Sequence, residues 1–179
     1  MKIIIYSLSL VVVVSFAALS PNQAQDPSKT VHDTSGMNQD EMNKRGDKVM
    51  GFEHAKTTHH FILAPEGGAI EVSANMAADK SSRAKIRSHL SHIAMMFAEG
   101  DFNAPFLIHQ QNPPGIEVMQ RLKNEIQYKF EKSERGGRVR ISTKDPEALQ
   151  AIHDFLRFQI KDHKTGDPLE LKSYEPDPR

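Results

Sequence analysis

The chain has 179 residues, carries 23 basic and 23 acidic side chains for a formal net charge of zero, and contains no cysteine. A balanced charge excludes the strong positive field that draws nucleic acid to a protein, so no nucleic-acid partner is expected. The absence of cysteine excludes disulfides and lipidation at a processed cysteine. The chain is long enough for one domain with an ordinary hydrophobic core.

The N-terminus has the form of a secretory signal peptide, because Lys2 precedes an apolar run over residues 3–18 and small residues follow the run. Cleavage is expected after Ala24, with Ser20 as the alternative position. An uncleaved membrane anchor is the competing interpretation, since the run approaches the length that spans a bilayer. We expect residues 1–24 to be removed and the mature protein to be exported to the periplasm or the extracellular space, without further membrane contact.

Residues 25–49 are expected to form a flexible segment, because their first half is polar and shows no apolar period. A short helix over residues 38–50 is the alternative, and Gly46 weakens it. The domain is therefore expected to begin near residue 50.

Two β-hairpins follow, each indicated by strands in which apolar and polar residues alternate. The first joins residues 59–63 to 69–74, and the second joins residues 126–132 to 138–143, each through a turn that ends in a Gly-Gly pair. The alternation places apolar side chains on one face of each hairpin and mostly charged side chains on the other. The apolar face is expected to carry His59, Phe61, Leu63, Ile70 and Val72, and then Ile126, Tyr128, Phe130, Val139 and Ile141.

Each hairpin leads into an amphipathic helix. Asp79 or Ser81 is expected to cap the first helix, which stops at Gly100. Asp145 is expected to cap the second helix, which ends before Gly166. The stripes expected to pack on the sheet are Ile86, Leu90, Ile93 and Phe97 in the first helix, and Leu149, Ile152, Leu156 and Ile160 in the second.

Two other segments lie outside this pattern. A proline-rich connection over residues 102–112 leads to a short helix that starts at Pro113-Pro114. Residues 168–179 are polar and rich in proline, which predicts a C-terminal tail.

The second hairpin and helix repeat the first. Gly136-Gly137 corresponds to Gly67-Gly68, Gly166-Asp167 corresponds to Gly100-Asp101, and one short deletion between strand and helix reconciles the copies. Residues 50–167 are therefore predicted to be one domain made of a duplicated ββα unit. The predicted fold class is α+β, a two-layer sandwich in which two helices cover one face of an antiparallel sheet.

Several short motifs together resemble a family of exported bacterial proteins of uncharacterised function. They are Met50-Gly51-Phe52, Thr57-Thr58-His59-His60-Phe61, Pro113-Pro114-Gly115 preceded by His109, and His163-Lys164-Thr165-Gly166-Asp167. The resemblance covers nearly the whole mature chain. It implies export and a single domain, and it implies no activity.

Histidine and methionine are the unusual components, with nine and eight copies. Neutral imidazole suits copper, zinc and nickel, and thioether sulfur favours Cu(I), so copper is the metal that this composition predicts. The best local group is His89, His92 and Met96, whose spacing of three and four residues places them on one helix face. The competing interpretation is that these side chains flank the core with their polar ends in water, and methionine also fills gaps in cores.

Three further residues complete the predicted ligand set. His60 is expected on the open sheet face, whereas the adjacent His59 points to the opposite face and packs under the helices. His109 is expected in a loop and Met119 on the short helix that follows. A purely structural role is the alternative for each, as it is for His163, which would gain from the helix dipole when charged.

Three functions remain open at this point. The first is an exported metal-binding protein that captures copper and hands it over, using a subset of His60, His89, His92, Met96, His109 and Met119. The second is a non-catalytic domain whose open sheet face binds a ligand or a protein partner, and the third is an enzyme. Known catalytic motifs are absent from the sequence, including His-Glu-x-x-His, a phosphate-binding glycine loop and a Gly-x-Ser-x-Gly elbow, which disfavours an enzyme. The metal-binding protein is therefore the favoured hypothesis, and homodimerisation through open faces or edge strands stays undecided.

Overall fold

The computed structural model describes residues 34–171, so the expected signal peptide over residues 1–24 lies outside the described part of the chain. The elements are, in chain order, α1 (Thr34–Met50), η1 (His54–Lys56), β1 (Thr57–Ala64), β2 (Gly67–Ala74), α2 (Lys80–Ala98), α3 (Asn103–His109), α4 (Ile116–Arg121), η2 (Lys123–Glu125), β3 (Ile126–Lys132), β4 (Gly136–Thr143) and α5 (Pro146–Asp162). None of these helices combines the length and the apolar character needed to cross a membrane.

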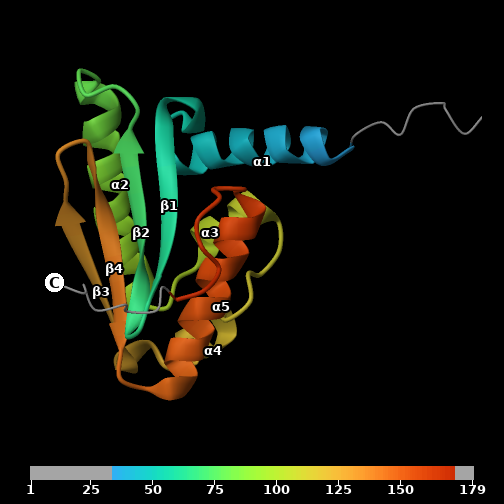
Figure 1. Ribbon diagram of the computed structural model, residues 1–179, viewed down its shortest axis with the longest axis vertical. Coiled ribbons are helices and arrows are strands. Elements are labelled where there is room, and N and C mark those ends of the chain that lie inside the picture. The colour runs from blue at the N-terminus through green and yellow to red at the C-terminus, as the bar shows by residue number, and fades with distance from the viewer. Residues whose placement is uncertain (1–33, 172–179) are drawn as a thin grey trace, which may run out of the picture. The chain divides into compact units, whose positions relative to one another are not determined.

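The four strands form one antiparallel sheet in the order β1-β2-β4-β3 (Figure 1). One face carries apolar side chains from all four strands, and these join residues of α2 and α5 in a single hydrophobic core. The core residues from the sheet include Phe61, Ile70, Val72, Ile126, Val139 and Ile141. The predicted α+β fold with an antiparallel sheet is confirmed.

Each long helix packs against the hairpin of the other predicted copy. α2 follows β1 and β2 in the chain but packs mainly on β4 and β3, while α5 follows β3 and β4 and packs mainly on β1. The first of these helices is capped by Asp79, one of the two predicted alternatives, and not by Ser81, and the second is capped by Asp145 as predicted. The side chain of each aspartate accepts a hydrogen bond from a backbone N–H in the first turn. Because each helix packs on the hairpin of the other copy, helix ends and strands from opposite halves of the chain lie close together.

The register between β2 and β4 is symmetric about the pair Ile70 and Val139. Gly68 pairs with Ile141. The corresponding residues of the other predicted copy, Gly137 and Val72, also pair with each other. Two ββα units related by a two-fold axis would produce such a register. The duplication itself stays a prediction, which this register supports.

The glycine pairs begin strands and do not end the turns, contrary to the prediction. The first turn consists of Pro65 and Glu66 alone, between β1 and β2. A Cβ atom added to Gly68 would stand 2.2 Å from the carbonyl oxygen of Ile62 in β1 and 2.4 Å from Cδ1 of Leu156 in α5. The close approach of the neighbouring strand and of the helix layer explains the glycine better than a turn does.

The apolar stripe of α5 differs from the prediction at its start. Leu149 is only half-buried, whereas Phe155, which the predicted stripe omitted, is buried. The ring centroid of Phe155 lies 6.0 Å from that of Phe97 and 6.2 Å from that of Phe102, in edge-to-face arrangements that stabilise aromatic pairs. The buried face of α5 is therefore turned toward Phe155 and away from Leu149. We attribute this difference from the prediction to the aromatic cluster, whose members are distant in sequence.

The expected flexible segment over residues 25–49 is helical from residue 34 onward, where it forms most of α1. Nε of Arg45 donates a hydrogen bond of 2.8 Å to the carbonyl oxygen of Ile108 in α3, and Met42 is buried. These tertiary contacts stabilise a helix whose intrinsic propensity Gly46 lowers.

The expected connection over residues 102–112 contains α3. Pro105 lies in the first turn of this helix, where the missing N–H costs no intrahelical hydrogen bond. His109 is therefore the last residue of a helix and not part of a loop.

Candidate functional site

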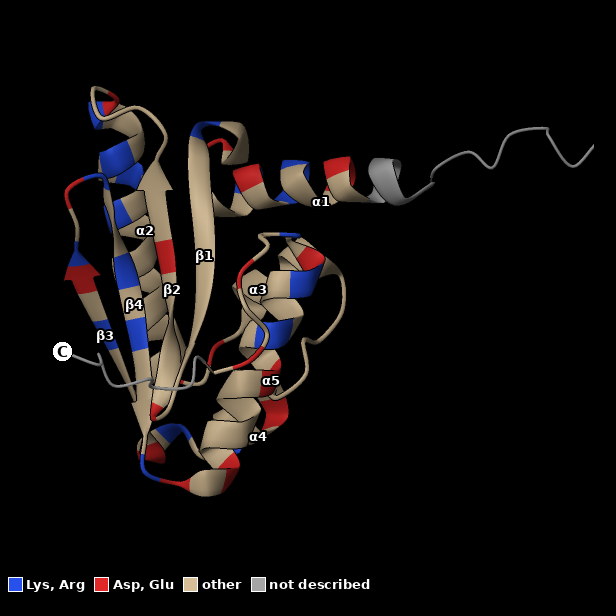
Figure 2. Ribbon diagram, viewed as in Figure 1, with Lys and Arg blue, Asp and Glu red and all other residues tan. Residues whose placement is uncertain are grey.

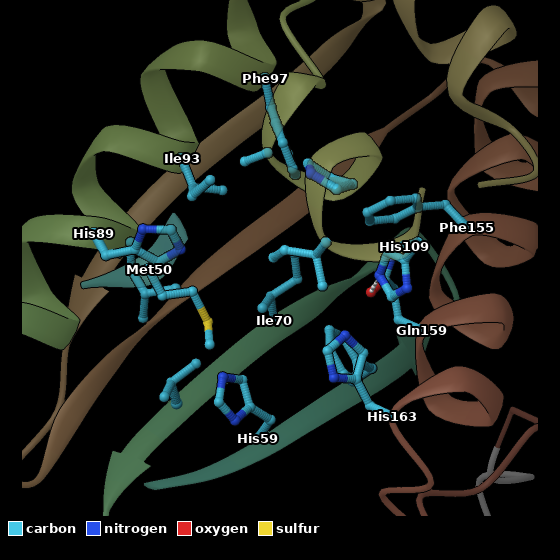
Figure 3. A pocket seen from close by; sticks show the side chains of 16 residues that line it. Met50, His59, Ile70, His89, Ile93, Phe97, His109, Phe155, Gln159 and His163 are labelled. Carbon is cyan, nitrogen blue, oxygen red and sulfur yellow. Dashed lines mark hydrogen bonds between the residues drawn. The ribbon is translucent and has the colours of Figure 1, made fainter. Parts of the chain in front are cut away.

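A small cavity lies between the apolar sheet face and the helices α2, α3 and α5 (Figure 3). Its volume is about 60 Å³, which is room for a few atoms since a water molecule needs roughly 10–15 Å³. We call it the inner cavity. The lining residues with a nitrogen, oxygen or sulfur atom in the side chain are Met50, His59, His89, His109, Gln159 and His163, and the remaining walls are apolar.

A second cavity of about 240 Å³ lies beside the C-terminal half of α1, and we call it the outer cavity. Met50, His59 and His163 line both cavities and so form the boundary between them. The outer cavity is also lined by Met42, Asn43, Gly46, His54, Thr57, Thr58 and Thr165. The boundary residues are therefore the only three described side chains that face both spaces.

His59 is the centre of the site. It is the third residue of β1 and points toward the helices, where its ring lies between Phe52, at a centroid distance of 6.2 Å, and His163, at 6.1 Å. Burial, with a smaller contribution from the neighbouring His89, lowers the pKa of His59 from 6.5 to about 4. Its Nε2 atom is buried and has no hydrogen-bond partner among the described residues.

His163 follows directly after α5 and also faces the cavities. Its ring centroid lies 5.0 Å from that of His109 and 5.3 Å from that of Phe61. Burial lowers the pKa of His163 to about 3, with smaller contributions from His109 and His59. Desolvation therefore opposes the charged form of His163, the form in which it would gain from the helix dipole.

His109 is held by two partners from α5. Its Nδ1 lies 2.5 Å from a carboxylate oxygen of Asp162, and its Nε2 lies 3.0 Å from Oε1 of Gln159. If the Gln159 amide is turned over, its nitrogen donates to Nε2 while Nδ1 donates to Asp162. Both ring nitrogens are engaged in either case, so His109 supports its neighbour His163 and has no free nitrogen for a ligand.

The predicted group on α2 is divided by the structure. His89 lines the inner cavity, and burial lowers its pKa to about 4. His92 is exposed, and Met96 is half-buried against the core without lining either cavity. The spacing places His89, His92 and Met96 on one side of the helix. Only His89 lines the inner cavity, and the other two side chains lie outside it.

The two remaining predicted ligands lie elsewhere. His60 is on the open sheet face, where its Nδ1 is 2.8 Å from a carboxylate oxygen of Asp167. The other oxygen of Asp167 accepts a hydrogen bond from the backbone N–H of Phe61, so this carboxylate fastens the residues after α5 to the edge strand β1. Met119 is fully buried in the core. Neither residue approaches the cavities.

The predicted ligand set does not contain Met50, His54, His59 or His163. One signal was present: His59 occupies an inward strand position at which the other copy has Tyr128, and an imidazole facing a core is unusual. By contrast His153, which is also buried, donates its Nε2 proton to the carbonyl oxygens of Ala64 and Gly67 at 2.9 and 3.0 Å. A structural role thus explains His153 and leaves Nε2 of His59 unexplained.

Charged residues recur along β3 and β4 (Figure 2), and the alternation along these strands places them on the open sheet face. Glu131 forms ion pairs with Lys129, Arg138 and Arg140 at 3.4, 2.8 and 3.9 Å. The hydrogen bond from Arg138 is the main cause of the lowered pKa of Glu131. This face is an internally paired, solvated surface, as a mixed charge pattern predicts.

The donor atoms define what the site can bind. Between residues 34 and 171 no three His, Asp or Glu side chains are placed to hold one metal ion. Imidazole nitrogens bind metals at about 2 Å, so two rings on one ion have centroids about 5–6 Å apart. The ring centroids of His59 and His163 are 6.1 Å apart, just beyond this range, and the two ring planes are inclined by 13°. A metal here would have two imidazoles and a thioether. The chain matches no protein-family model, no curated protein and no solved structure.

Proposed function

We propose that this is an exported metal-binding protein that captures copper at His59, His163 and Met50 and hands it over to a partner. The observation that carries the proposal is the buried, unpartnered Nε2 of His59, at the boundary between two cavities. A buried polar atom without a partner costs about 1–3 kcal/mol, and a bound metal ion would repay that cost.

The state of the histidines supports metal binding. A metal binds the neutral imidazole, and protonation competes with it. The lowered pKa values of His59 and His163, about 4 and about 3, keep both rings neutral at pH 7. No deprotonation is then needed before an ion binds, and the surrounding aromatic rings and His109 hold the two imidazoles in place.

The outer cavity supports capture and release. His54 lies on its wall and is 40% exposed, and its Nδ1 is 3.1 Å from a carboxylate oxygen of Asp47. Met42 provides a second thioether on the same wall. An ion would thus pass from solvent along donor side chains to the boundary residues. The proposal of export depends on the apolar run after Lys2.

The alternative function is a non-catalytic interaction domain that uses the open sheet face. The observation that favours it is that three cations share the single carboxylate of Glu131, which leaves positive charge available to an acidic partner. The metal-binding proposal ranks first because it accounts for the buried Nε2 of His59, which has no hydrogen-bond partner. The described residues of the open face include no comparable buried atom without a partner.

Copper titration followed by calorimetry tests the proposal. The wild-type protein is expected to bind one equivalent of copper. His59→Phe and His163→Phe keep a ring in the core but remove the donor nitrogen, and each should lower the affinity at least about 100-fold, which is the upper range for loss of a mere supporting residue. His92→Phe, on the exposed side of α2, is the matched control and should bind as the wild type does.

Two results would contradict the proposal. Unchanged affinity in both cavity variants would place the site elsewhere. A wild-type protein that binds neither Cu(I), Cu(II) nor Zn(II) would remove metal binding and leave the interaction domain as the remaining candidate.

A further inference from the structure

The number of donors at the boundary residues is small. Among the described residues, the site has the imidazoles of His59, whose Nε2 has no partner, and of His163, together with the thioether of Met50, since both ring nitrogens of His109 are engaged. Zinc sites in proteins have at least three nitrogen, oxygen or thiolate ligands and mostly four. Cuprous ions accept two or three ligands, so the coordination number favours Cu(I).

The charge of the site points the same way. No carboxylate of the described residues lines either cavity. Acidic groups that contact lining residues are already engaged: Asp47 with His54, Asp162 with His109, and Asp167 with Thr165 and the backbone N–H of Phe61. A divalent ion would therefore keep its full charge among neutral ligands and apolar walls. The cost of removing an ion from water grows with the square of its charge, so it is about four times larger for a divalent than for a monovalent ion.

The sulfur donors are the third observation. Met50 is the last residue of α1, and its side chain lies among those that line the inner cavity (Figure 3). Met42, two helical turns earlier, lines the outer cavity. Thioether sulfur is a soft ligand that binds cuprous ion and has little affinity for zinc. The same helix thus places a soft donor in each cavity.

We infer that this site selects monovalent soft ions, with Cu(I) as its cargo, and discriminates against Zn(II) and Cu(II). The inference rests on the proposed function, because it specifies the ion at the same residues. Coordination by two neutral imidazoles and one thioether, without a carboxylate, is the arrangement that produces the selectivity.

Competition between ions tests the inference. Cu(I), held under anaerobic reducing conditions, should bind at one equivalent and be displaced by Ag(I), whereas a 100-fold excess of Zn(II) should not displace it. Met50→Leu has nearly the same volume as the wild type and should lower the Cu(I) affinity at least 10-fold. Met95→Leu, whose side chain is 60% exposed on α2, is the matched control and should leave the affinity unchanged.

A spectroscopic readout separates ligation from a packing effect. Ag(I) should shift the methyl resonance of Met50 in a carbon–proton correlation spectrum and leave that of Met95 in place. Zinc binding as tight as Cu(I) binding, or full affinity in Met50→Leu, would overturn the inference. The proposed function would survive either result if binding still required His59, whereas loss of that requirement would overturn the proposed function itself.

Discussion

Lowering the pH from 7 to 4 is expected to destabilise the metal-free protein by several kcal/mol. The cause is the set of half-buried histidines around the cavities, since desolvation lowers the pKa of His59 and His89 to about 4 and that of His163 to about 3. In the unfolded chain each imidazole has a pKa near 6.5. Between pH 6.5 and pH 4 the unfolded state therefore binds protons that the folded state excludes, and stability falls as the pH falls through this window.

The magnitude follows from the pKa differences. One pKa unit corresponds to about 1.4 kcal/mol, so His59 and His89 would each cost about 3 kcal/mol at pH 4. A domain of this size has a total stability of about 5–15 kcal/mol, and the three histidines together remove a large part of it. Asp79, Glu131 and Asp167 also have lowered pKa values, and the stability that these carboxylates contribute is lost as the pH falls through their pKa values in the folded state.

Urea unfolding at a series of pH values measures this effect. The free energy of unfolding of the wild type should be constant above about pH 7 and decrease steadily between pH 6.5 and pH 4. His59→Phe should flatten part of that decrease, because it removes one proton-binding group, whereas His92→Phe should not. A free energy that stays constant over this window would show that the histidines are not buried in solution.

Replacing Leu156 by alanine is expected to lower the free energy of unfolding by about 2–5 kcal/mol, in the upper half of that range. The side chain of Leu156 is fully buried in α5 and packs directly over the bare backbone of Gly68. A glycine has no side chain that could move into the space, so the cavity should stay open and the loss of contacts should be large. Leu90→Ala, at the corresponding position of α2, is expected to have a similar effect.

The control for this experiment is Leu149→Ala in the same helix. Leu149 is half-buried, so its replacement should cost clearly less than that of Leu156. Urea melts of the three variants at pH 7 give the comparison. Equal small losses at Leu156 and Leu149 would mean that α5 does not present the face seen here to the sheet.

The sequence by itself predicted the elements whose causes are local. Alternation of apolar residues indicated the four strands, and Asp79 and Asp145 marked the helix starts because capping involves residues only three apart. The fold class followed from the order of these elements. The inward orientation of His59 was also correct, since side chains alternate along a strand.

Tertiary structure alone decided where the candidate site lies. Periodicity places His89 and His92 on one side of a helix, yet the wall of the cavity, formed by other elements, divides them. Met50, His59 and His163 meet because α1, β1 and the end of α5 converge, and α5 reaches β1 only by packing on the hairpin of the other copy. Local patterns specify which face of an element is buried. Which other element packs against that face depends on the contacts of the whole core, and no single segment of the sequence carries that information.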